Sequence, residues 1–307
     1  MLDTETMRTF IKVVESNSFS KAAKLLYKTP AAISYRIKSL EADLNTQLFE
    51  RTTRTVTLTL AGQHLYEQCS QWLLWLSTMP DELQQIRDGV ERKINITINN
   101  LLYDVEAVAD LLAFLKEKFP FTHFNVNRQV YMGVWDSLLH GECHLAIGAT
   151  GTESLDTMIN ILPLGEVSWV FVAAKHHPIS QIEGALSNET LRKYPAINVE
   201  DTSVHMNKRV AWLLPSQSEI IVPNISTKLA CHLRGLGIGF LPKSICQSYL
   251  DSGELIACRV INERKPSPLS LAWKKTHMGK VMNEIVNLFR FHHPIANNFL
   301  KNIDKRR

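Results

Sequence analysis

Residues 18–59 read SFSKAAKLLYKTPAAISYRIKSLEADLNTQLFERTTRTVTLT, and this stretch decides the fold of the first part of the chain. Apolar residues recur in it at helical spacing, while its charge is unbalanced. The stretch contains seven basic residues but only three acidic ones. The basic residues are Lys21, Lys24, Lys28, Arg36, Lys38, Arg51 and Arg54, and the acidic ones are Glu41, Asp43 and Glu50. A compact helical unit with cations on one side is suited to phosphates, so the stretch predicts a DNA-binding module rather than an enzyme.

Two helices are expected at the start of this module. Residues 4–16 place apolar side chains at three- and four-residue steps, which predicts a first helix. Ser18 is a candidate N-cap for a second helix. In that helix Ala22, Ala23 and the pair Leu25-Leu26 are expected to pack against the first, as in a helix-turn-helix.

The third helix has the clearest signals. Thr29 is a candidate N-cap, Pro30 takes the first helical position, and Ile33, Ile37 and Leu40 form a buried stripe. The opposite side then carries Ala31, Ser34, Tyr35 and Lys38. In helix-turn-helix proteins the N-terminal part of this helix enters the major groove. Ser34 and Tyr35 suit base edges and the Ala31 methyl suits thymine, whereas Arg36 and Lys38 suit phosphates.

A two-stranded wing is expected next, from Leu48-Phe49 and from the alternating residues 56–59, with Arg51 and Arg54 in its turn. The full set of expected DNA-contacting residues is Ser18, Lys28, Thr29, Pro30, Ala31, Ser34, Tyr35, Arg36, Lys38, Arg51 and Arg54. The alternative is a solvated basic packing unit, since a charge run by itself is usually a solvated face. The N-cap, the first-turn proline, the buried stripe and the basic wing all indicate the same winged helix-turn-helix, and this agreement favours DNA binding.

The composition is that of a globular protein, with 45% apolar and 21% charged residues and a net charge of +4 over 307 residues. No apolar run reaches the roughly 20 residues that cross a bilayer, and the first residues lack an export leader. The five cysteines are widely spaced without zinc-ligand spacing, which indicates a reduced cytoplasmic location.

Residues 60–88 predict a long helix that exposes a stripe of large apolar side chains, including Trp72 and Trp75. A small domain cannot cover such a stripe, so the helix is expected to pair with a second chain. The alternative is packing against the chain's own C-terminal part. Pro80 is expected to end or kink the helix, and Gly89 to act as a hinge.

After Gly89, strands alternate with helices, which predicts an α/β domain built on a parallel sheet. The expected strands are 93–98, 124–131, 144–147 and material within 158–174, and the expected helices are 105–119, 134–139 and 226–233, with 189–195 and 206–214 mixed or helical. Lobe crossovers are expected near Pro163-Leu164 and near residues 266–268, where chain breakers cluster. In such sheets ligands bind at the carboxyl ends of strands, often between two lobes.

Polar residues at these strand ends and helix starts predict a site for a small anion such as a carboxylate. They are Asn99, Asn100, Gly148, Ala149, Thr150, Thr202, Ser203, Asn224 and Thr227. Each taken alone is explained equally well as a helix cap or turn residue. The glycine run 235–239 follows a helix instead of opening one, so it indicates a tight turn and not a nucleotide site. We expect no catalytic residue, metal or cofactor.

The N-terminal module resembles the LysR family of transcriptional regulators, and the effector domain of that family is similar to the rest of the chain. The motifs that carry the likeness are Met7-Arg8-Thr9-Phe10, Ser18-Phe19-Ser20-Lys21-Ala22-Ala23, Ala32-Ile33-Ser34, Ile37-Lys38-Ser39-Leu40-Glu41, Leu48-Phe49-Glu50-Arg51, Leu58-Thr59-Leu60-Ala61-Gly62, His144-Leu145-Ala146-Ile147-Gly148, His177-Pro178 and the run GLGIGFLP at 235–242. Residues 32–38 and 131–136 resemble members of the family that regulate purine or glyoxylate metabolism. The chain departs from the family at Pro30-Ala31 and Tyr35-Arg36, which face bases there, so a consensus operator is not expected.

The resemblance implies a winged helix-turn-helix at 1–60, a dimerisation helix and hinge at 61–90, and a two-lobed domain like periplasmic binding proteins at 91–300. Lobe I would comprise 91–163 and 268–300, and lobe II 164–267. The implied partners are double-stranded DNA, a small-molecule effector, further copies of the chain in a homodimer or homotetramer, and RNA polymerase, with no membrane. Two alternatives stay open. One is a metabolite-binding protein whose basic module contacts a protein partner, and the other is a hydrolase on the two-lobed domain, for which no nucleophile and base can be named.

Overall fold

The computed structural model describes residues 2–51, 56–209 and 211–304. The chain divides into two compact units between Asp88 and Gly89, and Gly89 has a positive φ of 80°. Within the described residues, no helix has both the length and the apolar character needed to span a bilayer.

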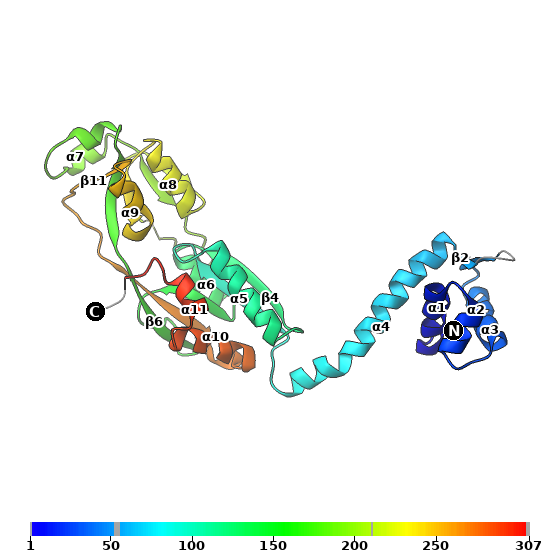
Figure 1. The fold of residues 1–307 in the computed structure, drawn as a ribbon. Coiled ribbons are helices and arrows are strands. Elements are labelled where there is room, and N and C mark those ends of the chain that lie inside the picture. Colours follow the sequence, from blue (N-terminus) through cyan, green and yellow to red (C-terminus); the bar gives the residue numbers. More distant parts are fainter. Residues whose placement is uncertain (1, 52–55, 210, 305–307) are drawn as a thin grey trace. The chain divides into compact units, whose positions relative to one another are not determined.

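The first unit is a helix-turn-helix with a wing and a long helix (Figure 1). Its elements are α1 (Thr4–Ser16), α2 (Phe19–Leu25), α3 (Pro30–Asp43), β1 (Phe49–Arg51), β2 (Val56–Leu58) and α4 (Leu60–Arg87). The predicted stripe of α3 is confirmed, because Ile33, Ile37 and Leu40 are buried against Phe10 of α1. The prediction for Leu25 is wrong, since this side chain is 58% exposed.

Side-chain caps fix where these helices begin. Ser18 accepts a hydrogen bond from the backbone N–H of Lys21 at 3.3 Å, and Thr29 accepts one from Ala32 at 3.2 Å. Both are the N-caps that the sequence predicts, and they satisfy donors that a helix leaves unpaired in its first turn. The two predicted wing strands form, and β1 and β2 pair antiparallel. The prediction that Arg51 lies in the turn between them is wrong, because Arg51 pairs with Val56 as the last residue of β1.

Helix α4 contributes Cys69 to the core of the first unit and leaves most of its length exposed. Trp75 and Leu83 are more than half exposed, so the described residues of the first unit leave this apolar stripe uncovered. The helix does not end at Pro80, which lies inside it. Pro80 is exposed, so water can satisfy the carbonyl group that loses its helical partner there.

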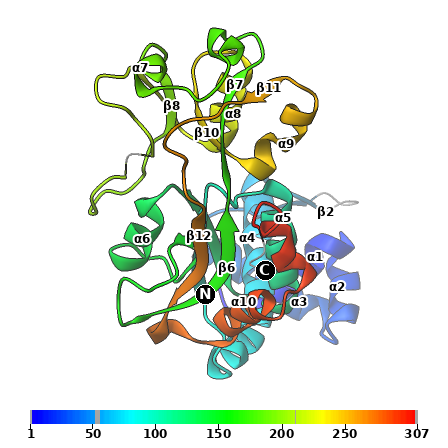
Figure 2. The same ribbon diagram turned by 90° about the vertical axis from the view of Figure 1, so that its left-hand side faces the viewer.

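The second unit is an α/β domain of two lobes (Figure 2). Its first elements are β3 (Lys93–Asn99), α5 (Val105–Lys118), β4 (His123–Gln129), α6 (Met132–Leu139), β5 (Leu145–Thr150), β6 (Ile159–Val167) and β7 (Trp169–Ala174). The rest are η1 (Pro178–Gln181), α7 (Asn188–Leu191), β8 (Ala196–Val199), β9 (Glu219–Val222), α8 (Ile225–Leu233), β10 (Gly239–Pro242), α9 (Lys243–Asp251), β11 (Leu255–Ala257), β12 (Ser267–Lys274), η2 (Lys275–His277), α10 (Lys280–Arg290) and α11 (Pro294–Phe299).

Lobe I is built on a sheet with the strand order β4-β3-β5-β12-β6, and lobe II on the sheets β10-β7-β11 and β8-β9. β3 runs parallel to β4 and β5, whereas β12 is antiparallel to both its neighbours, so the sheet is mixed and not wholly parallel. The chain crosses between the lobes twice, from β6 into β7 and from β11 back into β12.

Two details of lobe boundaries and loops differ from the sequence predictions. Pro163 does not mark a crossover, because β6 continues through it to Val167. β6 is an edge strand with a register irregularity near Pro163, which is where a sheet tolerates proline. The described residues of 206–214 form neither helix nor strand. The carboxylate of Asp201 draws the backbone N–H groups of Ser203 and Arg209 to itself, at 2.9 and 2.7 Å.

The glycine run forms the predicted turn between a helix and a strand. Gly235 follows α8 with a φ of 67°, and Gly239 opens β10 with a φ of 154°. Both angles lie where only glycine is readily accommodated, which explains the residue type without a nucleotide.

Candidate functional site

The outward side of α3 is largely exposed to solvent. Tyr35 is 77% exposed, and Ala31 and Lys38 are also exposed. Ser34 is half-buried beside them. These side chains share the face opposite the buried stripe, so a hydroxyl, a phenol, a methyl group and an ammonium point away from the bundle together. That face can approach base edges and phosphates.

Two of the cations expected to contact DNA are held by α1. The guanidinium of Arg36 lies 3.0 Å from the Glu5 carboxylate and donates a hydrogen bond to the Thr6 hydroxyl at 3.2 Å. Lys28 forms an ion pair with the same Glu5. These groups are partly exposed, so the pairs are weak and can exchange for phosphates.

The remaining predicted DNA contacts divide into two groups. Ser18, Thr29 and Pro30 begin α2 and α3, so their first role is to set the positions of these helices. The side chain of Arg51 and the whole of Arg54 lie outside the described residues.

A second candidate site lies between the two lobes of the α/β domain. The cavity has room for about one water molecule. Its lining comes from both lobes, and it consists of Asn99, Asn100, Leu101, Val130, Tyr131, Trp169, Val199, Ile225 and Lys228.

Lys228 brings an amino group into this cavity, and the group is a cation when protonated. The side chain belongs to α8 and is only 2% exposed. Burial, reinforced by the charge of Arg264 and opposed by Glu219, lowers the pKa of Lys228 to about 7. No carboxylate among the described residues forms an ion pair with its ammonium group. A buried cation of this kind favours an anionic ligand that replaces its lost hydration.

Arg264 adds a second charge where the chain crosses between the lobes. Its guanidinium carbon lies 3.5 Å from the ring centroid of Trp169, which belongs to the other crossover. The Trp169 indole also donates a hydrogen bond to the Ser267 hydroxyl at 3.0 Å. Burial lowers the pKa of Arg264, and its Nη1 is buried without a hydrogen-bond partner in the described structure. The cations therefore lie beside the segments that a lobe movement would bend.

Asn100 supplies an unused hydrogen-bonding group to the cavity. Its side-chain Oδ1 is buried and has no partner among the described residues. Asn99 also lines the cavity, but its amide is occupied: it donates to the Gly148 carbonyl at 2.8 Å and accepts from the N–H of Leu101 at 2.9 Å. A ligand with both an anionic group and a hydrogen-bond donor matches Lys228 and Asn100 together.

The other predicted ligand contacts do not line this cavity and serve local structure. Asn224 caps α8 by accepting from Thr227, and Thr202 accepts from the backbone N–H of Val130. Ser203 donates to the Met206 carbonyl. Gly148 with a φ of 90°, Ala149 in the core and Thr150, whose carbonyl accepts from Trp135, complete this set.

The sequence reasoning missed Tyr131, Trp169, Lys228 and Arg264. One signal was available, because Lys228 falls among the apolar positions of an amphipathic helix, where a cation is unusual.

Two family models match the chain. The model for the bacterial regulatory helix-turn-helix protein of the lysR family matches residues 4–63, and the model for the LysR substrate binding domain matches residues 87–292.

Curated relatives and solved structures agree with these matches. The chain is 54% identical over 300 residues to the HTH-type transcriptional activator AllS of Salmonella paratyphi A, which covers 98% of this chain and 97% of that protein. It is 57% identical over 257 residues to AllS of Klebsiella pneumoniae, covering 84% and 95%. An OxyR C206 mutant of Corynebacterium glutamicum has the same fold, with a TM-score of 0.57, 16% identity and coverage of 98% and 94%. The chain therefore belongs to the LysR family of bacterial helix-turn-helix transcriptional regulators, which are not enzymes.

Proposed function

We propose that this regulator activates genes of allantoin use in response to a small anionic effector that binds between its two lobes. The observation that carries the proposal is the buried Lys228 in the cavity wall, because a buried lysine that forms no ion pair with a carboxylate of the described residues favours an anionic ligand. The identity to AllS activators over nearly the full chain supports the choice of genes.

DNA recognition falls to the outward side of α3. Tyr35 and Ser34 read base edges, the Ala31 methyl contacts thymine, and Lys38 neutralises a phosphate. Lys28 and Arg36 exchange Glu5 for phosphates when the duplex arrives. Arg51 and Arg54 of the wing are assigned to the backbone or the minor groove.

The effector is an anion instead of neutral allantoin. Glyoxylate is a two-carbon carboxylate, and its hydrated form carries hydroxyl donors. Its carboxylate would pair with Lys228 and Arg264, and a hydroxyl would satisfy Asn100. Because the present cavity is too small, the lobes must open to admit the ligand and close around it. The ligand then shifts the population toward the closed state.

Pairing through α4 supplies the symmetry for two half-sites. The exposed stripe, which includes Trp72, Leu76 and Leu83, supports burial against a second copy. Homodimers formed in this way can pair into a homotetramer, in which effector binding changes the spacing or the bend of bound DNA. RNA polymerase is the partner for activation, and the cytoplasm, where the chromosome lies, is the place of action.

Footprinting with the full-length protein tests this function. The probes are the promoters of allantoin-utilisation genes and the region upstream of the regulator's own gene, each with and without glyoxylate and with allantoin as the neutral comparison. We expect two protected half-sites whose pattern changes with glyoxylate, and an affinity that falls steeply as salt rises. Binding that is absent at low ionic strength would favour the protein-partner alternative, and a response to allantoin alone would overturn the anion assignment.

A further inference from the structure

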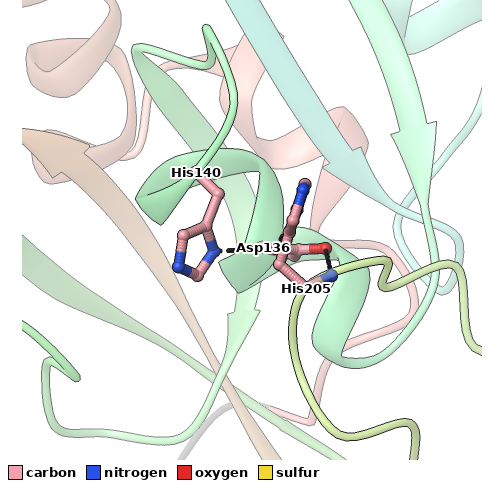
Figure 3. A group of neighbouring side chains, drawn as sticks. All are labelled: Asp136, His140 and His205. Atoms are coloured by element: carbon pink, nitrogen blue, oxygen red, sulfur yellow. Dashed lines mark hydrogen bonds and ion pairs between the residues drawn. The ribbon is translucent and has the colours of Figure 1, made fainter.

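A carboxylate and two imidazoles meet where the two lobes touch, away from the cavity lining. Asp136 and His140 are one turn apart at the end of α6, so they share one face of the helix. His205 comes from the segment of lobe II that follows β8. In the described part of the chain, these three residues form the one group of potential metal ligands whose atoms all lie within 4.8 Å of one another. Figure 3 shows both rings beside the Asp136 carboxylate.

The three side chains are joined by hydrogen bonds whose lengths lie close to the spacing of ligand atoms around a shared ion. Nδ1 of His140 lies 2.8 Å and Nδ1 of His205 lies 3.3 Å from the same oxygen, Asp136 Oδ1. An ion bound at about 2.0–2.2 Å holds its ligand atoms roughly 3–3.5 Å apart. The imidazoles are 47% and 62% exposed, so small side-chain rotations can complete the approach and water can fill the open positions.

The carboxylate is fixed in advance by backbone donors. Asp136 is 6% exposed, and its Oδ2 accepts the N–H groups of Val204 at 2.6 Å and His205 at 2.9 Å. These backbone donors hold Oδ2 and leave Oδ1 directed at both rings, and outer hydrogen bonds of this kind orient metal ligands.

We propose that Asp136, His140 and His205 bind a divalent transition-metal ion, with Zn²⁺ as the best match, and that the ion joins lobe I to lobe II. Two imidazole nitrogens and one carboxylate oxygen suit Zn²⁺ and its neighbours in the first row. The site is separate from the effector cavity and needs no residue of it.

The ion would stiffen a contact that reaches the cavity wall. The same lobe II segment also binds the start of α6, because the Asp201 carboxylate accepts hydrogen bonds from the backbone N–H groups of Met132 and Gly133, both at 3.2 Å. Tyr131, the residue before α6, lines the cavity. A metal that holds the far end of α6 to the same segment would limit the movement of the lobes around the ligand.

Zinc titration of the tag-free, full-length protein tests the site. We expect one Zn²⁺ per chain to bind at the cluster, and His205→Ala or His140→Ala to weaken this binding at least about tenfold. His123→Ala is the control, since it removes an exposed imidazole elsewhere in the same unit. Unchanged affinity and stoichiometry in both cluster variants would overturn the proposal, as would an equal loss in the control.

Hydrogen exchange tests whether the ion joins the lobes. With Zn²⁺, amide exchange should slow in both the α6 segment 130–140 and the segment 200–209 of the wild-type protein, and in neither segment of His205→Ala. Slowing that is confined to one segment, or that persists in the variant, would contradict the bridge.

Discussion

Lys228 is a lysine held almost wholly out of water, at 2% exposure, in the wall of a cleft. Its folded pKa of about 7 lies below its ordinary value of 10.5, so the unfolded chain binds more protons between these two pH values. The stability of the unliganded protein should therefore rise as the pH increases through this window. Lys228 destabilises the fold when it is charged, yet it lines the cavity. This combination is typical of a residue that serves ligand binding rather than stability.

Replacing Lys228 separates the effect of its ammonium group on stability from its effect on ligand binding. Lys228→Met should leave the thermal stability unchanged or higher, because it removes a buried charge, while abolishing glyoxylate binding in calorimetry. Lys193→Met, an exposed lysine of the same lobe, is the control and should bind normally. Wild-type affinity should fall roughly fivefold between pH 7 and pH 8 as the ammonium loses its proton. Affinity that is independent of pH would argue against this role.

Glu5 pairs with Lys28 and Arg36, two cations that are expected to bind phosphates of DNA. Glu5→Gln releases Lys28 and Arg36 from their shared carboxylate, at a cost of about 0.5 kcal/mol per exposed pair. Duplex affinity should rise, and the dependence of log affinity on log salt should steepen by roughly one to two phosphate contacts. A salt dependence equal to that of the wild type would mean that these cations serve only the contact between α1 and α3.

Individual residues also show how far sequence reasoning can reach. Thr29 and Pro30 were predictable because a cap and a first-turn proline act within one helical turn. The grouping of Asn100, Lys228 and Arg264 was not, because only tertiary packing brings residues so distant in sequence together. The same is true of His205, whose partners Asp136 and His140 lie on another element.

At the scale of the elements, α4 leaves a stripe of large apolar side chains exposed. Leu76→Glu together with Leu83→Glu places charges in its apolar stripe and should reduce the oligomer to monomers in analytical ultracentrifugation. The folded unit itself should survive, because both side chains are exposed in the single chain. Ser77 is an exposed residue on another face of α4, so Ser77→Glu should leave the mass of the oligomer unchanged. A charged stripe that still assembles would place the interface elsewhere.

Element boundaries were predictable where the local pattern and the tertiary context agree. The α3 prediction held because its caps and its stripe indicate one helix. The prediction of a lobe crossover at Pro163 is wrong because an edge strand tolerates proline. The prediction of mixed or helical structure at 206–214 is wrong because the Asp201 carboxylate accepts backbone hydrogen bonds there. In both cases the decisive information is the position of the segment in the fold and not its composition.

At the scale of the whole molecule, the second unit couples two lobes through a few contacts. Arg264 stacks on Trp169 between the two crossovers, Lys228 of lobe II lines the cavity together with Asn100 of lobe I, and the Asp136 cluster includes residues of both lobes. An anion in the cavity and a metal at the cluster would both favour the closed arrangement. The α/β class was predictable from alternating strands and helices, and the two lobes were implied by the family resemblance. The antiparallel placement of β12 was not predictable, because pairing order is a tertiary property.

The central claim is that the outward side of α3 binds DNA, and duplex titrations at several salt concentrations test it most directly. Lys38→Ala should weaken binding to every sequence and lower the salt slope by about one, whereas Tyr35→Ala should reduce discrimination between operator and random DNA by about 1–3 kcal/mol. Lys193→Ala, in the second unit, should match the wild type. If both α3 variants bind operator and random duplexes with wild-type affinity and salt dependence, this surface is not the DNA-binding face.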